Sequence, residues 1–540
     1  MLAAGATAAG ARAASPGATG APPAAAPDPA VAAVTSRVVP VPSSVRPGGG
    51  AFRIAAGTPI TLDAGSSAPA RDVADYAAGL LRPATGYALP VVTGRAAHGV
   101  AEGGAADGDP AGIVLALGDP DQGLGDEGYR LRTTGASVLI SARTAAGLYH
   151  GVQTLRQLLP AAVESRSALP DTDWTVPSTD ITDVPRYAYR GAMLDVARHF
   201  FTVAQVERFI DQLALYKINT LHLHLTDDQG WRIAVDSWPR LTGYGGSTQV
   251  GGGPGGFYTQ ADYREIVAYA GAHFLDVVPE IDGPGHSNAA LASYPRLNCD
   301  GTSPALYTGT SVGFSTLCAA REDTYDFLGD VIGEVAALTP GPYLHIGGDE
   351  AQSTSAADYV SYVDRVQRIV ADHGKTAIGW HQIDAAHPAA GTIAQYWGTA
   401  GNEQEVAAAA QAGTRVIMSP ANRSYLDMKY TSSTTLGKSW AGYVDVRASY
   451  DWDPATYVKG VPASAVYGVE APLWTETLKT TADLDYMAFP RLPGIAELGW
   501  SPAATHDWDT YRVRLSAQAP RWDAMGISYY RSAQVAWPAG

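Results

Sequence analysis

The chain has 540 residues, of which 46% are hydrophobic, and its 37 basic and 53 acidic residues give a formal net charge of -16. This length exceeds one ordinary domain and is enough for two hydrophobic cores. The negative charge argues against nucleic acid or an anionic membrane as a partner. No stretch approaches the ~18 apolar residues of a membrane-spanning helix, so we expect a soluble protein.

The first 37 residues consist almost entirely of Ala, Gly, Pro, Ser and Thr. Such a segment has almost no bulky side chains to bury and cannot offset the entropy lost on ordering, so residues 1–37 are predicted to be disordered. The segment also lacks the basic start and Leu-rich centre of an intact signal peptide. It is either the remnant of a signal peptide or a linker exposed after cleavage.

Residues 38–184 mix short β-like runs with two helical stretches, which predicts a small α+β domain. The β-like runs are Ile60–Leu62, Ile113–Leu117 and Ser137–Ile140. The helical stretches are Ala70–Leu81 and Ala145–Leu159, the second with leucine and valine recurring at helical spacing. Because no carboxylate cluster appears in this part of the sequence, we expect it to support catalysis rather than perform it.

Residues 185–540 alternate short apolar runs with longer amphipathic stretches, a pattern typical of strand–helix units around a parallel sheet. Thr202 and Gln205 form a capping-box pattern at the start of the first helix. The expected strands are Tyr189–Leu194, Thr220–His224, Leu275–Val278, Tyr343–Ile346, Thr376–Trp380, Ile393–Trp397, Arg415–Met418 and Val466–Glu470. Eight such strands close into a (β/α)8 barrel, although periodicity by itself does not separate a barrel from an open sheet.

Residues 345–350 read His-Ile-Gly-Gly-Asp-Glu and are the most informative stretch of the chain. An apolar run ends there at a glycine pair, so we expect a buried strand that delivers Asp349 and Glu350 to its C-terminal end. In a barrel of parallel strands, these ends form the active face. Adjacent acids repel, which predicts a raised pKa for one of them, as a general acid requires. The alternative is a solvated Asp-Glu pair in a loop, which the preceding glycines disfavour.

This hexapeptide resembles the signature of the family 20 glycoside hydrolases, the β-N-acetylhexosaminidases. Residues 190–198, 221–232 and 278–286 resemble the first three barrel strands of that family, in the same order. Residues 128–131 and 151–157 are similar to its N-terminal accessory domain. The resemblance covers about Val38 to the C-terminus and implies a (β/α)8 TIM barrel, here residues 185–540, preceded by an α+β accessory domain.

The resemblance also implies an exo-acting hydrolase that removes terminal GlcNAc or GalNAc from β-glycosides, including chitin oligosaccharides, with retention of configuration. Retaining glycosidases ordinarily need two carboxyls about 5 Å apart, and family 20 is an exception in which the substrate's acetamido oxygen attacks. An oxazolinium intermediate forms. Glu350 would protonate the leaving oxygen, Asp349 would orient the acetamido group and stabilise its charge, and Tyr425 would bind its carbonyl.

Other positions match sugar-binding residues of the family. Arg198 and Glu476 would bind hydroxyl groups, as would Asp427. Tryptophans at predicted strand ends and in one loop would form the apolar wall for a sugar face and an acetamido methyl, namely Trp380, Trp397, Trp440 and Trp474. A structural role at helix contacts is the prediction for Trp231, Trp500 and Trp522.

The resemblance further implies that an Asp–His pair, here Asp227 and His286, tunes the acid/base glutamate, and that the enzyme uses no metal and no cofactor. The residues themselves leave an alternative open. His222 and His224 alternate on one strand and share a face, and with Asp227, Asp228 and His286 they would suit a metal-dependent barrel hydrolase.

The chain has two cysteines, Cys299 and Cys318, about 19 residues apart in a Gly/Ser/Thr-rich stretch. This spacing suits a disulfide worth roughly 3 kcal/mol, and two unrelated buried thiols are the alternative. A disulfide would indicate an oxidising compartment, so we expect a secreted protein.

Other activities remain open at this level. A family member that releases a disaccharide unit, such as a lacto-N-biosidase, would need a wider pocket, and a sugar-binding barrel without activity is the non-enzymatic alternative. The spaced acidic strand motif of family 18 chitinases is absent from the sequence. The expected partner is a small carbohydrate, and the expected state is a monomer or a weak homodimer.

Overall fold

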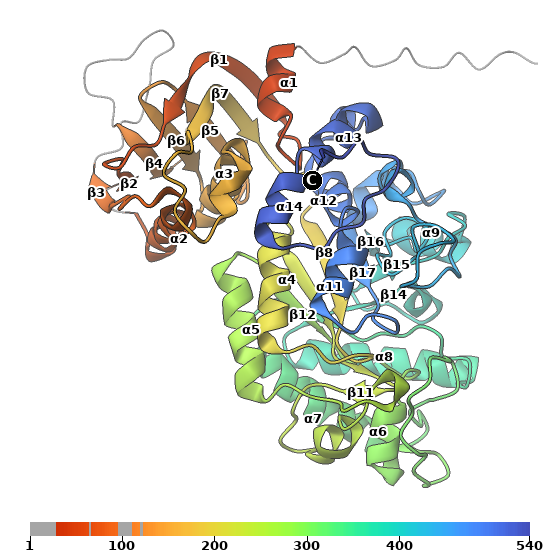
Figure 1. Ribbon diagram of the computed structural model, residues 1–540. Helices are drawn as coiled ribbons and strands as arrows, with labels where there is room; N and C mark the ends of the chain where they lie inside the picture. Colours follow the sequence, from red (N-terminus) through yellow and green to blue (C-terminus); the bar gives the residue numbers. More distant parts are fainter. Residues whose placement is uncertain (1–28, 64–65, 95–110, 119–122, 540) are drawn as a thin grey trace, which may run out of the picture.

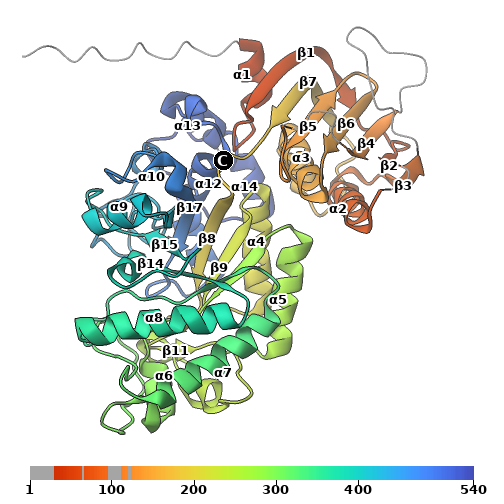
Figure 2. The same cartoon turned by 180° about the vertical axis from the view of Figure 1, so that it is seen from behind.

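The computed structural model describes residues 29–63, 66–94, 111–118 and 123–539. An N-terminal domain lies beside one end of a larger barrel domain (Figure 1), and the view from behind shows helices α4, α5, α7 and α8 covering the outside of the barrel (Figure 2). The predicted order, an α+β domain followed by a (β/α)8 barrel, is confirmed.

The N-terminal domain contains a mixed seven-stranded sheet in the order β1-β7-β5-β6-β4-β2-β3. Helices α2 (Ala68–Thr85) and α3 (Ala145–Leu158) pack on it, close to the two predicted helical stretches. The strands are β1 (Ser44–Arg53), β2 (Ile60–Asp63), β3 (Val91–Gly94), β4 (Gly112–Leu117), β5 (Tyr129–Thr133), β6 (Ser137–Ala142) and β7 (Thr175–Asp183). Strands β2, β4 and β6 match the predicted runs, whereas β1, β3, β5 and β7 were not predicted; the Pro-Gly-Gly-Gly centre of β1 carries no apolar alternation.

The prediction of disorder for residues 1–37 is wrong at its C-terminal end. Residues Pro29–Thr35 form helix α1, and Val34 and Thr35 are buried. Alanine has the highest helix propensity, and Val34 gives the helix an apolar contact with the domain. Residues 1–28 lie outside the described part of the chain.

Eight parallel strands close the barrel, each within a few residues of its predicted position. They are β8 (Tyr189–Asp195), β9 (Thr220–His224), β12 (Asp276–Glu280), β13 (Tyr343–His345), β14 (Thr376–Trp380), β15 (Ile393–Tyr396), β16 (Arg415–Met418) and β17 (Val466–Leu473). A short hairpin of β10 (Thr226–Asp227) and β11 (Gly230–Trp231) follows β9.

Helices connect most of these strands, and the capping box of Thr202 and Gln205 is present at the start of α4. After β14, however, only a short 3-10 turn (His381–Ala385) leads to the next strand. The helices are α4 (Val203–Leu215), α5 (Gln260–Ala272), α6 (Asn288–Ser293), α7 (Glu322–Leu338), α8 (Ala356–Asp372), α9 (Gln404–Gln411), α10 (Val446–Tyr450), α11 (Thr481–Ala488), α12 (Leu492–Trp500), α13 (Trp508–Ser516) and α14 (Ala519–Met525). Among the described residues, no helix combines the length and apolar character needed to cross a membrane.

The strands carry an apolar layer and a charged layer of side chains in the barrel. One buried cluster consists of Tyr189, Val278, Ile378, Ile393 and Ile417. Residues two positions further along a strand face the same side, and these are Glu280 on β12, Trp380 on β14 and Gln395 on β15. The sequence therefore places polar groups toward the C-terminal ends of the strands, above an apolar base.

Buried ion pairs join the two domains. Lys217, which follows α4 of the barrel domain, lies 3.2 Å from Asp183 at the end of β7, and both side chains are fully buried. The Tyr129 hydroxyl also donates to Asp183, at 2.6 Å. Because each charge needs the other, this contact fixes how the accessory domain sits on the barrel.

Replacing Lys217 with alanine is expected to destabilise the protein by about 3–5 kcal/mol, because Asp183 would remain buried without its cation. The shift of the urea unfolding midpoint measures this effect. Lys479→Ala, at an exposed position, is the matched control and is expected to change stability by less than about 0.5 kcal/mol. Equal midpoints for the two variants would contradict the stabilising role of the pair.

Candidate active site

All but two of the predicted site residues, the disulfide cysteines aside, line one pocket of ≈ 390 Å³ at the C-terminal ends of the barrel strands. The strand ends and the loops that follow them supply the lining. The predicted residues found there are Arg198, His286, Asp349, Glu350, Trp397, Tyr425, Asp427, Trp440, Trp474 and Glu476. Sites of small ligands are typically concave, mostly apolar and roughly 300–1,000 Å³ in volume, so this pocket suits a small molecule.

The two exceptions lie behind the lining. Trp380 is fully buried; its ring centroid lies 5.7 Å from that of Trp474, so in this structure it supports the wall from behind. Asp227 is also buried, and its carboxylate faces His286 rather than the pocket.

A tight turn at the end of β13 presents the acid pair, as the glycines predicted. Gly347 and Gly348 have φ angles of 66° and 103°, in the region that glycine adopts without cost. A Cβ atom at Gly347 would lie 1.5 Å from an oxygen of Asp282, so no other residue fits there. The turn brings Asp349 and Glu350 into the pocket side by side.

His286 lies between the acids and the barrel interior. Its Nε2 is 3.3 Å from Glu350 Oε2 and 3.8 Å from Asp349 Oδ2, and its Nδ1 is 3.3 Å from Asp227 Oδ1. Burial alone would lower the pKa of His286, but the carboxylates of Asp227 and Asp349 outweigh it and raise that pKa well above its ordinary value. The imidazole is therefore a cation at neutral pH.

The two carboxyls of the pair lie in different environments. The side chain of Asp349 is 12% exposed, whereas that of Glu350 is 30% exposed. Burial raises the pKa of Asp349 to about 6, against the opposing effect of His286 and with a further contribution from Glu350. The structure thus assigns the predicted raised pKa to Asp349.

Asp227 is surrounded by cationic donors. Arg198 Nη2 lies 2.8 Å away, and His224 Nε2 lies 2.7 Å away. Burial would raise the pKa of Asp227, but Arg198 and His286 lower it well below its ordinary range, so the carboxylate stays ionised. Arg198 also stacks over the Trp474 ring, 4.8 Å from its centroid, which holds the guanidinium at the pocket.

Aromatic rings form the rest of the wall. Tyr425 is 4% exposed, and its ring centroid lies 5.9 Å from that of Trp440 and 6.2 Å from that of Trp474. Trp397 lies edge-on to Trp440, with centroids 5.8 Å apart. Trp440 is 55% exposed and stands at the rim. This arrangement offers apolar faces and, through Tyr425, one hydroxyl group.

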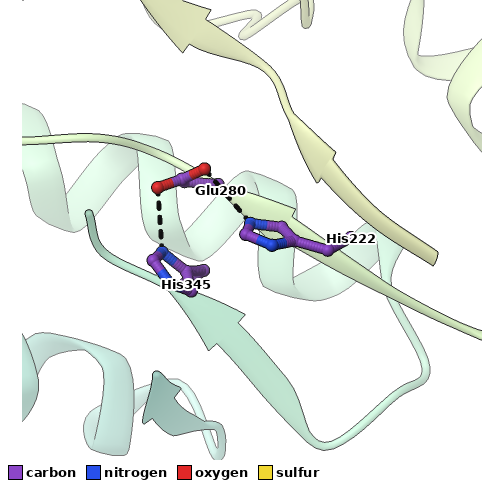
Figure 3. Close-up of side chains that lie close together, drawn as sticks. All are labelled: His222, Glu280 and His345. Atoms are coloured by element: carbon purple, nitrogen blue, oxygen red, sulfur yellow. Dashed lines mark ion pairs between the residues drawn. The ribbon is translucent and has the colours of Figure 1, made fainter. Parts of the chain in front are cut away.

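The three histidines and Asp227 that were considered for a metal site are held by ion pairs, whereas Asp228 accepts hydrogen bonds from Asn288 and Ser315. His222 Nδ1 lies 2.9 Å from Glu470 Oε1 and its Nε2 lies 3.1 Å from Glu280 Oε2. Figure 3 shows Glu280 between His222 and His345, whose Nδ1 is 2.9 Å from the other Glu280 oxygen. The donor atoms of His222, Glu280 and His345 are close enough together to hold a metal ion, yet these ion pairs already account for their proximity.

Several residues of the pocket and of the charged layer below it were not predicted. Glu280 and Glu470 stand on strands of that layer, and nothing in the sequence around them reveals their partners on other strands. Thr310, Val312 and Lys438 also line the pocket, and they come from loops. The predicted disulfide between Cys299 and Cys318 is confirmed, with Cα atoms 5.0 Å apart, and it closes the loop that carries Thr310 and Val312. The two cysteines were therefore the signal in the sequence that could have pointed to this loop.

Two family models together match most of the chain. Residues 187–503 match the catalytic domain of glycosyl hydrolase family 20, and residues 35–184 match domain 2 of that family. A β-N-acetylhexosaminidase from Cellulomonas fimi is 47% identical over 437 residues, which are 81% of this chain and 86% of the relative.

Solved structures agree with these matches. The family 20 β-N-acetylhexosaminidase of Streptomyces coelicolor A3(2) is 62% identical, with a TM-score of 0.88 over 93% of this chain and 99% of that one. A mutant Streptomyces plicatus β-hexosaminidase in complex with its product GlcNAc gives the same identity and TM-score over 93% and 98%. The chain therefore belongs to glycosyl hydrolase family 20, in the enzyme class of the β-N-acetylhexosaminidases.

Proposed function

We propose that the enzyme removes terminal β-linked GlcNAc or GalNAc from glycosides and chitin oligosaccharides, with retention of configuration and through an oxazolinium intermediate. The observation that carries this proposal is the convergence of Asp349 and Glu350 on one nitrogen of His286. Two carboxyls that attack and protonate one bond flank it at about 5 Å. Consecutive carboxyls on one turn do not flank a bond, which supports a nucleophile supplied by the substrate.

In the first step, the acetamido oxygen attacks the anomeric carbon while the glycosidic C–O bond breaks. Glu350 gives its proton to the leaving oxygen, and the electron pair of the broken bond stays with that oxygen. In the second step, Glu350 takes a proton from water, whose oxygen attacks the same carbon and opens the oxazolinium ring. The ring-closing attack is intramolecular and gains a large effective molarity.

The other pocket residues bind the acetamido group and the sugar. The ionised Asp349 orients the acetamido N–H and stabilises the charge that develops on that group. Tyr425 donates a hydrogen bond to the acetamido oxygen. Arg198, Asp427 and Glu476 bind ring hydroxyls, and Trp397, Trp440 and Trp474 cover the apolar faces. The GlcNAc bound to the related S. plicatus enzyme supports this class of substrate.

Initial rates on an aryl β-N-acetylglucosaminide and on the matching aryl β-glucoside test the proposal. Only the acetamido sugar is expected to react, because the glucoside lacks the internal nucleophile, and a chelator is expected to leave the rate unchanged. Equal turnover of both substrates would reveal a nucleophile in the protein. Loss of activity with chelator would support the metal-dependent alternative, and no turnover of either would support a binding protein.

The pH profile of kcat/KM tests the role of Asp349. The carboxyl must be ionised to stabilise the acetamido cation, and its pKa is about 6, so activity is expected to fall as the pH drops through about 6 and the carboxylate takes up a proton. Asp349→Asn is expected to lose this limb together with about 10²–10³-fold in kcat. A wild-type profile with full activity well below pH 6 would contradict the assignment.

A second variant tests the Asp227–His286 pair. We propose that this pair tunes the carboxyl of Glu350 for proton transfer. His286→Ala removes the cation that contacts both acids and is expected to change the shape of the same profile. A profile that superimposes on that of the wild type would exclude this role.

We also propose that the enzyme is secreted, because a disulfide closes the loop that reaches the pocket. Titration of the unfolded enzyme, recovered from the culture medium of its source, is expected to find no free thiol. Two free thiols per chain, or enzyme retained inside the cells, would contradict secretion in this form.

A further inference from the structure

We propose that Glu280 and His224, which are fully buried and do not line the pocket, are positioning residues for the acid/base carboxyl of Glu350. The inference rests on the proposed function, in which Glu350 transfers the proton. It extends the machinery of that step from the pocket into the charged layer of the barrel.

A continuous series of charged groups joins Glu280 to Glu350. His224 donates through Nδ1 to Glu280, and its Nε2 lies 2.7 Å from Asp227 Oδ2. The other oxygen of Asp227 lies 3.3 Å from His286 Nδ1, and His286 Nε2 lies 3.3 Å from Glu350 Oε2. Carboxylates and imidazoles thus alternate from the barrel interior to the pocket.

This arrangement requires His224 to carry two protons. A neutral imidazole has one N–H, but here both ring nitrogens face carboxylates. Burial alone would lower the pKa of His224, and the carboxylates of Glu280 and Asp227 outweigh it and raise that pKa well above its ordinary value. Without the charge of Glu280, His224 would lose one of the two anions that stabilise its charged form, and its hydrogen bond to Asp227 would weaken because the donor carries less positive charge.

The weaker contact between His224 and Asp227 would then affect the pocket. Asp227 would keep Arg198, but its donor on the side of the barrel would be weaker, so its carboxylate would be held less firmly against His286. His286 and Glu350 both have left-handed backbones, with φ angles of 51° and 46°. For residues other than glycine this conformation costs roughly 1–2 kcal/mol, so contacts of the side chains must hold the pair in place.

Glu280 is also fixed from its other side. Figure 3 shows it facing His222 of β9 and His345 of β13, and Trp380 Nε1 donates to it at 3.0 Å. Glu280 therefore has partners on three other strands, β9, β13 and β14, which hold it against His224. A side chain that is fixed by several contacts can in turn hold its neighbours in place.

Glu470 provides a matched control. It is as buried as Glu280 and also pairs with His222, at 2.9 Å, but it makes no contact with His224 or Asp227. Glu280→Gln and Glu470→Gln each remove one buried anion from the same layer. A loss of general stability would affect both variants, whereas a positioning role predicts a difference between them.

The experiment compares kcat/KM on dinitrophenyl and phenyl β-N-acetylglucosaminides, after thermal unfolding has shown that the variants are folded. The dinitrophenolate leaves with little help, whereas the phenolate needs the proton of Glu350, and general acid catalysis contributes about 10²–10⁴-fold. Glu280→Gln is expected to raise the dinitrophenyl-to-phenyl ratio about tenfold, in the direction of Glu350→Gln. Glu470→Gln is expected to leave the ratio at the wild-type value.

An unchanged ratio in folded Glu280→Gln, or equal changes in the two variants, would overturn the inference. If Glu280→Gln does not fold, the variants His224→Asn and His224→Gln replace it. The asparagine amide can take the place of Nδ1 but cannot reach Asp227. The glutamine amide can take the place of Nε2 and keeps the hydrogen bond to Asp227. The ratio is then expected to rise more for asparagine, and equal ratios would overturn the inference. Failure of the wild-type enzyme to hydrolyse either glycoside would instead refute the proposed function.

Discussion

The buried carboxylate of Asp227 is the anion on which the arrangement of the site depends. It receives the guanidinium of Arg198, the imidazolium of His286 and the ring of His224. An isolated buried anion would be costly, and the surrounding cations compensate that cost only while their geometry is kept. Because Arg198 and His286 share this one partner, the sugar binding proposed for Arg198 and the proton transfer proposed for Glu350 would be coupled: a displaced Asp227 would disturb both.

In the barrel, the side chains that stabilise the fold and the charged side chains near the site lie in different layers. The apolar cluster around Val278 and Ile378 occupies one layer, and Glu280 and Trp380, two residues further along the same strands, belong to the next. Charged groups in that upper layer add little stability themselves. The apolar layer and the outer helices stabilise the frame on which they stand, and the buried contact of Lys217 with Asp183 fixes the orientation of the accessory domain.

The sequence revealed the barrel strands because each is a short apolar run that ends at a polar residue or a glycine, and the spacing of such runs depends on local chemistry alone. The pocket residues with motifs, such as Asp349 and Glu350, were predictable for the same reason. Glu280 was not, because its partners on β9, β13 and β14 become neighbours only when the barrel closes. Trp380 was placed correctly at a strand end, but whether such a ring faces the pocket or packs behind it depends on its neighbours.

The disulfide between Cys299 and Cys318 changes the step at which the pocket rim loses conformational entropy. Thr310 and Val312 stand on a loop of irregular structure that would otherwise sample many conformations. With both ends of the loop covalently joined, part of that freedom is removed when the disulfide forms and not at each encounter with a sugar. The disulfide thus orders the rim before a sugar binds. The affinity of the pocket for a sugar is therefore expected to depend on whether Cys299 and Cys318 are oxidised.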